Sequence, residues 1–309
     1  MVVLRIDRTW WEHLSPKPMQ SRRNEVDALL RRFCATEYGR LWISTVRRPG
    51  GAIRISPGQI IPTIHIVGVG DAPMFIVPMK TMREGHRAVA SQTQYQGGPL
   101  PDGQLALQPV LMVDVVTDPA MIAAAKGMKE DLPAGAVKDP SLLFSAPARM
   151  LLAPTEYLKR SYVLYQHIFG GGGSYPSDGW FYVGVTTRSW QARWLEHRRA
   201  VESGSPLLFH RKLREELAAG GVTYIHHKVT AVTRDIEQLY NAEEFLVNGH
   251  WDDKRRLNMI PDGKSGLKYL RENGLLSERV VPMPDERDTI VETWIREHPR
   301  RGLPASSRP

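Results

Sequence analysis

Two strand-like runs with a glycine-rich spacer between them constrain the fold of this chain more than any other feature. Tyr162–Ile168 and Trp180–Thr186 are rich in tyrosine, valine and other residues that are favoured in strands. Between them lie Gly170–Gly173 and Ser174–Gly179, whose composition is typical of a turn. Two such runs joined by a turn-rich spacer predict a β-hairpin in the second half of the chain.

The segments that follow this hairpin alternate between helical and strand patterns. Ser189–Val201 and Pro206–Ala219 predict two helices, the second preceded by a serine that can cap it. Val222–Val232 predicts a third strand, and Arg234–Val247 predicts a further helix. The second half therefore has the order hairpin, two helices, strand and helix.

The first half mixes helical and strand patterns. Apolar spacing predicts helices over Asn24–Glu37 and Ala120–Glu130, and the polar stretch Lys80–Gly103 predicts a long loop. Leu132–Pro154 reads as a connection to the second half. Runs rich in branched residues predict strands at Leu41–Val46, Ala52–Ser56, Ile60–Val69, Pro73–Pro78 and Leu105–Val116.

Composition restricts the class of protein. At 309 residues the chain is long enough for two compact domains, and its net charge of +8 would attract polyanions. Genome composition alone also produces many basic chains, so this charge does not decide the partner. The single cysteine, Cys34, excludes an internal disulfide framework. Apolar runs such as Val110–Val116 are too short to cross a bilayer, so we expect a cytoplasmic location without a membrane partner.

The first predicted helix of the second half carries charge on its apolar face. Trp190, Trp194 and Val201 follow helical spacing, and Arg193 and His197 lie along the same stripe. An arginine partly sunk in an apolar surface needs an anionic partner, because burying it unpaired is costly. Arg193 is therefore either part of a structural ion pair or a ligand for an anion.

The last predicted helix of the second half carries a carboxylate on its apolar face. Glu243 falls on the stripe of Leu239 and Leu246, whereas its neighbour Glu244 falls on the opposite side. A carboxylate in such a place is expected to be paired, protonated or bound to a metal. An ion pair between Arg193 and Glu243 would satisfy both helices, so a structural role competes with a catalytic one.

Five short motifs in this order resemble the GIY-YIG nuclease domain, over a region from about Tyr157 to Leu275. The first motif keeps the family's tyrosine but lacks its leading glycine. The motifs are Val163-Leu164-Tyr165, Tyr182-Val183-Gly184, Arg193-Trp194 followed by His197, Glu243 followed by Phe245-Leu246-Val247, and Leu257-Asn258 before Pro261-Asp262-Gly263.

Together with the sequence patterns of the first half and of the tail, the resemblance implies an α+β fold in three parts. Residues 156–275 would form a GIY-YIG-like domain with a small three-stranded antiparallel sheet flanked by helices. Residues 1–150 would form a mixed, strand-rich α/β accessory domain with a possible role in target recognition. Residues 276–309 would form a basic tail with one short helix near Asp285–Glu297 and a disordered end.

The resemblance also implies a metal-dependent endonuclease that hydrolyses phosphodiester bonds, with DNA as the expected partner. Glu243 would hold one Mg²⁺ or Mn²⁺ against the scissile phosphate, and Arg193 would neutralise its non-bridging oxygens. Tyr165 would act as general base or orient the water, helped by Tyr182 or His197.

Two further residues complete the implied site. Asn258 would hydrogen-bond within the site and order it. Some members of the family carry an additional histidine after the first helix, for which His210 is only an unsupported substitute.

Two alternatives remain open at this point. A nuclease of the same fold could act on RNA, because the implied site residues contact phosphate rather than base or sugar. A non-catalytic nucleic-acid-binding protein could instead use Arg193 and Glu243 as an internal ion pair. In the first half, Trp10 and Trp11 could stack on bases, although such tryptophans more often belong to a core.

Overall fold

The first segment of the chain is helical. Thr36 caps one of its helices, since the Gly39 amide donates to the Thr36 hydroxyl at 3.1 Å. The four helices of this segment are α1 (Arg8–Leu14), α2 (Lys17–Gln20), α3 (Arg23–Cys34) and α4 (Glu37–Arg47). The computed structural model describes residues 4–47, 53–55, 63–69, 72–76, 105–107, 109–117, 140–154, 161–171 and 179–304.

The strand predicted over Leu41–Val46 is wrong, because this segment belongs to α4. Its branched residues favour a strand locally, but Trp42, Thr45 and Val46 are buried at the spacing of one helical face. Packing of that face decides the conformation. The predicted helix Ala120–Glu130 and loop Lys80–Gly103 lie outside the described residues.

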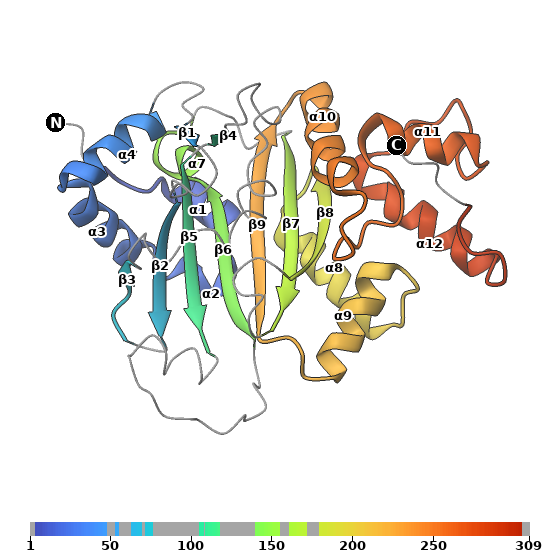
Figure 1. Cartoon of the computed structure of the whole chain (residues 1–309), viewed down its shortest axis with the longest axis horizontal. Coiled ribbons are helices and arrows are strands. Elements are labelled where there is room, and N and C mark those ends of the chain that lie inside the picture. The colour runs from blue at the N-terminus through green and yellow to red at the C-terminus, as the bar shows by residue number, and fades with distance from the viewer. Residues whose placement is uncertain are drawn as a thin grey trace.

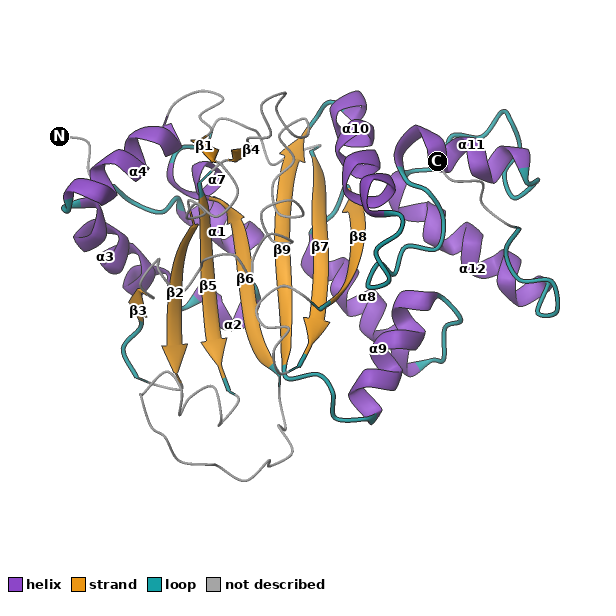
Figure 2. Ribbon diagram, viewed as in Figure 1, coloured by secondary structure: helices purple, strands orange, loops and turns teal. Residues whose placement is uncertain are grey.

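Seven of the described strands form one mixed sheet, in the order β3-β2-β5-β6-β9-β7-β8 (Figures 1 and 2). A separate two-stranded ladder joins β1 (Ile53–Ile55) to β4 (Leu105–Leu107). The strands of the large sheet are β2 (Thr63–Val69), β3 (Phe75–Ile76), β5 (Val110–Val116), β6 (Ser141–Pro147), β7 (Tyr162–Gly170), β8 (Trp180–Thr186) and β9 (Tyr224–Thr233).

The expected small three-stranded antiparallel sheet is therefore wrong. Strand β7 lies between β8 and β9 and pairs antiparallel with both as expected, but β9 also pairs with β6 in parallel. Strand β6 lies in Leu132–Pro154, which the sequence suggested to be a connection. The other edge of β6 pairs antiparallel with β5, so the sheet continues into strands of the first half. The predicted boundary at 150–156 thus falls between two strands of one sheet.

Helices cover both faces of this sheet. One face packs against the N-terminal helices, α7 (Ala148–Leu152), α8 (Trp190–Glu202) and α9 (Leu208–Ala218). Trp10 and Trp11 are buried in this core, so they are not available to stack on bases. The opposite face of β7, β8 and β9 packs against α10 (Ile236–Val247).

The C-terminal helices lie beyond the edge strand β8 (Figure 1). They are α11 (Gly263–Glu272) and α12 (Arg287–Glu297), which share a third apolar cluster with part of α10. The short helices η3 (Asn248–His250) and η4 (Pro284–Glu286) precede them. Within the described part of the chain, none of the helices has the length and apolar character that crossing a bilayer requires.

Four histidines lie buried between the sheet and the helices α8 and α9. His227 stacks on Trp190 with 4.6 Å between ring centroids, and its Nδ1 lies 3.1 Å from Nδ1 of His167. Burial lowers the pKa of His227 to about 3 and also lowers the pKa values of His167, His197 and His210. These rings are therefore neutral in the folded protein at pH 7.

The buried histidines predict a loss of stability in acid. Below pH 6.5 the unfolded chain binds a proton at His227 that the folded protein does not accept until about pH 3, so unfolding becomes easier as the pH falls. Each such histidine contributes about 1.4 kcal/mol per pH unit. Urea unfolding of the wild type and His227→Asn between pH 7 and 4 should give slopes that differ by about one proton. Parallel profiles would contradict this account.

Candidate active site

Tyr165 lies at an irregularity in the sheet. Leu164 pairs with Ala231 but Tyr165 pairs with Val229, so β9 holds one extra residue at a β-bulge. On the other side Tyr165 faces Gly184 of β8, where an added Cβ would lie 2.5 Å from the Tyr165 hydroxyl. The glycine of the Tyr182-Val183-Gly184 motif therefore makes room for the Tyr165 ring.

Helix α8 brings Arg193 and His197 against these strands. Ser189 caps the helix, and the Trp190 indole donates to the Leu14 carbonyl at 2.9 Å, which ties α8 to α1. The Tyr165 hydroxyl lies 3.3 Å from His197 Nε2. The structure thus brings Tyr165, Tyr182, Arg193 and His197 together on one face of the sheet.

A carboxylate from α12 completes this cluster. The Tyr182 hydroxyl donates to Asp288, and Arg193 lies 3.6 Å from the same Asp288 oxygen. Arg193 also pairs with Glu196 at 2.6 Å, but its buried Nε has no hydrogen-bond partner among the described residues. The cluster therefore holds one anionic oxygen, that of Asp288, and the Arg193 Nε remains as a further donor.

A chain of hydrogen bonds leads away from Tyr165. His197 Nδ1 lies 2.8 Å from His210 Nε2, and His210 Nδ1 lies 2.8 Å from the Ser205 hydroxyl. If Tyr165 donates to His197 Nε2, then His197 Nδ1 can donate to His210 Nε2 and His210 Nδ1 to the Ser205 hydroxyl, so each contact has one donor and one acceptor. Burial and Arg193 lower the pKa of His197, so it is neutral at pH 7 and its Nε2 can accept the hydrogen bond from Tyr165.

Burial opposes the ionisation of both tyrosines. It raises the pKa of Tyr165, and the nearby Arg193 only partly offsets this effect. It raises the pKa of Tyr182 as well, and the negative charge of Asp288 adds to it. The lowering of the Tyr165 pKa that a general base requires is therefore not present in this arrangement.

Glu243 lies beside this cluster in a second group of charges. Helical spacing predicts that it is buried, and it is 1% exposed. Both of its oxygens accept hydrogen bonds from the Arg287 guanidinium, at 2.8 and 2.6 Å. Arg287 also donates to Asp262 at 3.1 Å, so one guanidinium serves two buried carboxylates. Burial raises the pKa of both carboxyl groups, and Arg287 opposes it.

Asn258 connects this second group to the sheet. Its side chain accepts from the Val183 amide at 3.0 Å and donates to the Val183 carbonyl at 2.9 Å, which covers part of the edge of β8. It also donates to Asp262 at 2.8 Å. Gly263 follows with φ 63°, a left-handed conformation that favours glycine, and an added Cβ there would lie 2.6 Å from the Tyr240 carbonyl. These contacts fix the position of Asp262.

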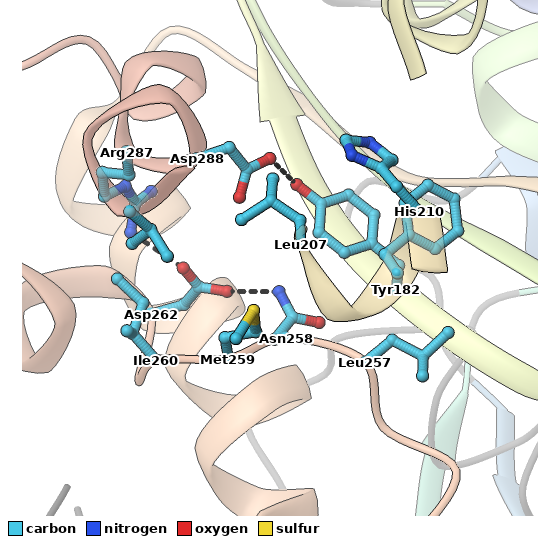
Figure 3. Close-up of a pocket in the computed structure, with 12 residues that line it drawn as sticks. Tyr182, Leu207, His210, Leu257, Asn258, Met259, Ile260, Asp262, Arg287 and Asp288 are labelled. Carbon is cyan, nitrogen blue, oxygen red and sulfur yellow. Dashed lines mark hydrogen bonds and ion pairs between the residues drawn. The ribbon is translucent and has the colours of Figure 1, made fainter. Parts of the chain in front are cut away.

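The two groups meet around one small cavity (Figure 3). Its volume is about 30 Å³, which is enough for one or two water molecules. Tyr182, His210, Asn258, Asp262 and Asp288 line it together with apolar side chains and Arg287. The predicted site residues therefore form two neighbouring groups, and one member of each group, Tyr182 and Asn258, lines this pocket.

The implied metal does not fit the residues as they are arranged. Both oxygens of Glu243 are bonded to Arg287, and the two oxygens of Asp262 are bonded to Arg287 and Asn258. Across the described residues, no group of three or more His, Cys, Asp or Glu side chains could hold a metal ion. A guanidinium lies on the carboxylate to which the resemblance assigns Mg²⁺.

Neither Arg287 nor Asp288 was predicted from the sequence. The predicted internal ion pair joined Arg193 to Glu243, but Arg193 pairs with Glu196 and Asp288 while Glu243 pairs with Arg287. The one feature of the sequence that pointed to Arg287 is that a buried Glu243 requires a cation. Nothing in the local pattern of the C-terminal segment indicates which arginine supplies it.

Comparisons with known proteins give no match: no family model, no curated protein and no solved structure resembles this chain significantly.

The contact between Gly184 and Tyr165 gives a test of this geometry. Gly184→Ala should displace the Tyr165 ring and lower the free energy of unfolding by about 1–3 kcal/mol, since overpacking a filled core costs this much. Gly249→Ala is the matched control, because an added Cβ there meets nothing within 4 Å. Urea unfolding of both variants measures the difference, and equal stability would show that Tyr165 does not depend on Gly184.

Proposed function

We propose that this chain is a nuclease that hydrolyses phosphodiester bonds in nucleic acid, with DNA as its substrate. The main support for the proposal is the position of Asp288, whose carboxylate contacts the Tyr182 hydroxyl and the Arg193 guanidinium. Phosphate oxygens use the same donors, and arginine is well suited to them. The family resemblance of the five motifs and the net charge of +8 agree with a polyanionic substrate.

Each residue has a role that follows from its surroundings. Arg193 offers to the non-bridging oxygens of the phosphate its fixed charge and its Nε, which has no hydrogen-bond partner in the described part of the chain. His197 is neutral and hydrogen-bonded to Tyr165, so this pair can orient a water molecule. His210 and Ser205 hold the His197 ring in one orientation. Tyr182 provides a further donor for the phosphate.

The expected Mg²⁺ or Mn²⁺ enters the proposal only as a condition of the assay, because Glu243 is saturated by Arg287 in this arrangement. We place the activity in the cytoplasm, a reducing compartment that agrees with a chain containing one cysteine.

A substitution at Arg193 tests the function. Arg193→Gln should reduce the cleavage rate about 10²–10³-fold, because it removes a preorganised charge from the transition state. The matched control is Arg198→Gln on the same helix, since Arg198 is 60% exposed and contacts only Glu202 at 3.8 Å among the ion pairs described. Duplex, nicked, flapped and single-stranded DNA and RNA are each incubated with Mg²⁺, Mn²⁺ or EDTA.

Equal cleavage by the wild type and Arg193→Gln would refute the assigned site. Cleavage of RNA alone would replace the substrate. Binding to these substrates without cleavage in any buffer would favour the non-catalytic alternative, in which the charged groups only hold the fold together.

A further inference from the structure

A groove on the C-terminal helices lies apart from the candidate site. Its volume is about 330 Å³, and it shares no lining residue with the cavity of the candidate site. It is formed by the start of the connector after α11, with Leu275, and by one side of α12. Figure 1 shows these helices on the side of the molecule opposite α3 and α4. The residues that α12 contributes to the groove are Thr289, Ile290, Thr293, Trp294 and Glu297.

Trp294 is held in one orientation at this groove. Its indole N–H donates to the Gly302 carbonyl at 3.2 Å, and its ring stacks on His298 with 4.0 Å between the ring centroids. Because the ring is already fixed, a partner that packs against it pays little conformational entropy to order it. Tryptophan is also one of the side chains that contribute most to protein interfaces. Trp294, with Leu275 and Ile290 beside it, therefore provides an apolar anchor point.

A carboxylate lies at each end of this side of α12. Glu286, Ile290, Thr293 and Glu297 follow one another at helical spacing, so they share one side of the helix. Both glutamates are exposed, and neither forms an ion pair within the described part of the chain. Glu286 accepts a hydrogen bond from the Met283 amide at 2.9 Å, which leaves its charge without a cation. The apolar centre of the groove is therefore flanked by two negative charges.

The charge of this region is opposite to that of the whole chain. From Glu272, the last residue of α11, to Glu297, the last residue of α12, acidic residues outnumber basic ones by more than two to one, whereas the chain has a net charge of +8. Of the basic residues in this stretch, Arg287 is buried on two carboxylates and Arg296 pairs with Glu292. Such a surface repels nucleic acid and attracts a basic partner.

We propose that this groove binds a basic peptide segment of a partner protein, with an apolar side chain between two arginines or lysines. The apolar side chain packs against Trp294, and the two cations pair with Glu286 and Glu297. These glutamates are eleven positions apart in the sequence, which corresponds to about 16 Å along a helix. An extended peptide covers this distance in about five residues, at about 3.3 Å each. The interaction does not depend on the proposed nuclease activity.

Binding of a synthetic peptide tests this surface. The probe is fluorescein-labelled Arg-Ala-Leu-Leu-Ala-Arg, and its binding to the full chain at low salt is followed by fluorescence anisotropy. The double variant Glu286→Gln and Glu297→Gln should bind the probe about tenfold more weakly, because each exposed ion pair changes the affinity a few-fold. Glutamine can still accept the hydrogen bond from the Met283 amide, so the fold should be unchanged. Glu292→Gln is the matched control, since Glu292 lies on another side of the same helix and pairs with Arg296.

An absence of probe binding by the wild type, or equal affinity in the wild type and the double variant, would overturn the proposal. A loss of affinity in Glu292→Gln as large as that in the double variant would do the same, because the effect would then follow net charge rather than the groove.

A second substitution places a cation in the groove from within the chain. Thr293 is exposed, and its hydroxyl donates to the Thr289 carbonyl of the same helix, so changes at this position should not disturb the core. Thr293→Lys should abolish probe binding, because its ammonium group competes with the peptide for the two glutamates. Thr293→Met is the uncharged control of similar length and should retain measurable binding. Equal affinity in these two variants would refute a partner selected by charge.

A second copy of the chain is the competing occupant, because the rest of the sequence is strongly basic. Sedimentation of the wild type and of the double variant in the same low-salt buffer separates the two cases. A wild type that stays monomeric and binds the probe supports the peptide partner. Self-association of the wild type that the double variant loses, without probe binding, would overturn it and assign the groove to a second copy.

Discussion

The arrangement at the edge of the sheet depends on one buried cation. Arg287 neutralises Glu243 and Asp262, and no other ion pair of these two buried carboxylates is found among the described residues. Removing one partner from such a pair typically costs about 3–5 kcal/mol. From Asp262 the contacts continue through Asn258 to the backbone of Val183 in β8. A single guanidinium thus joins the C-terminal helix, α10 and the sheet.

Much of the local structure of the second half could be predicted from the sequence. The hairpin of β7 and β8, the third strand β9 and the helices α8, α9 and α10 follow from periodicity and capping. The sheet as a whole could not be predicted, because strand β6 is a short apolar run between Pro140 and Pro147 that resembles a connection. Pairing of β6 with β9 joins residues about eighty positions apart, and no local pattern records such a contact.

The candidate site, like the fold, could be predicted from the sequence only in part. Helical spacing identifies Glu243 as buried, and the cost of burying charge predicts that it must be paired, protonated or metal-bound. This reasoning cannot choose among the cations of the chain. Arg193 was the nearest candidate by motif, yet Arg287 provides the contact because α12 folds back over α10 and α11. Asp288, which follows Arg287 in the sequence, forms an ion pair with Arg193.

The charge of Asp288 acts on both the anion site and the acid–base state of the candidate site. Burial raises the pKa of Tyr165, and the negative charge of Asp288 raises it further, while Arg193 lowers it. Arg193 in turn contacts two carboxylates, those of Glu196 and Asp288. Loss of the Asp288 charge would therefore favour ionisation of Tyr165 and leave Arg193 with one carboxylate fewer. The protonation state of Tyr165 and the availability of the Arg193 charge thus depend on the same side chain.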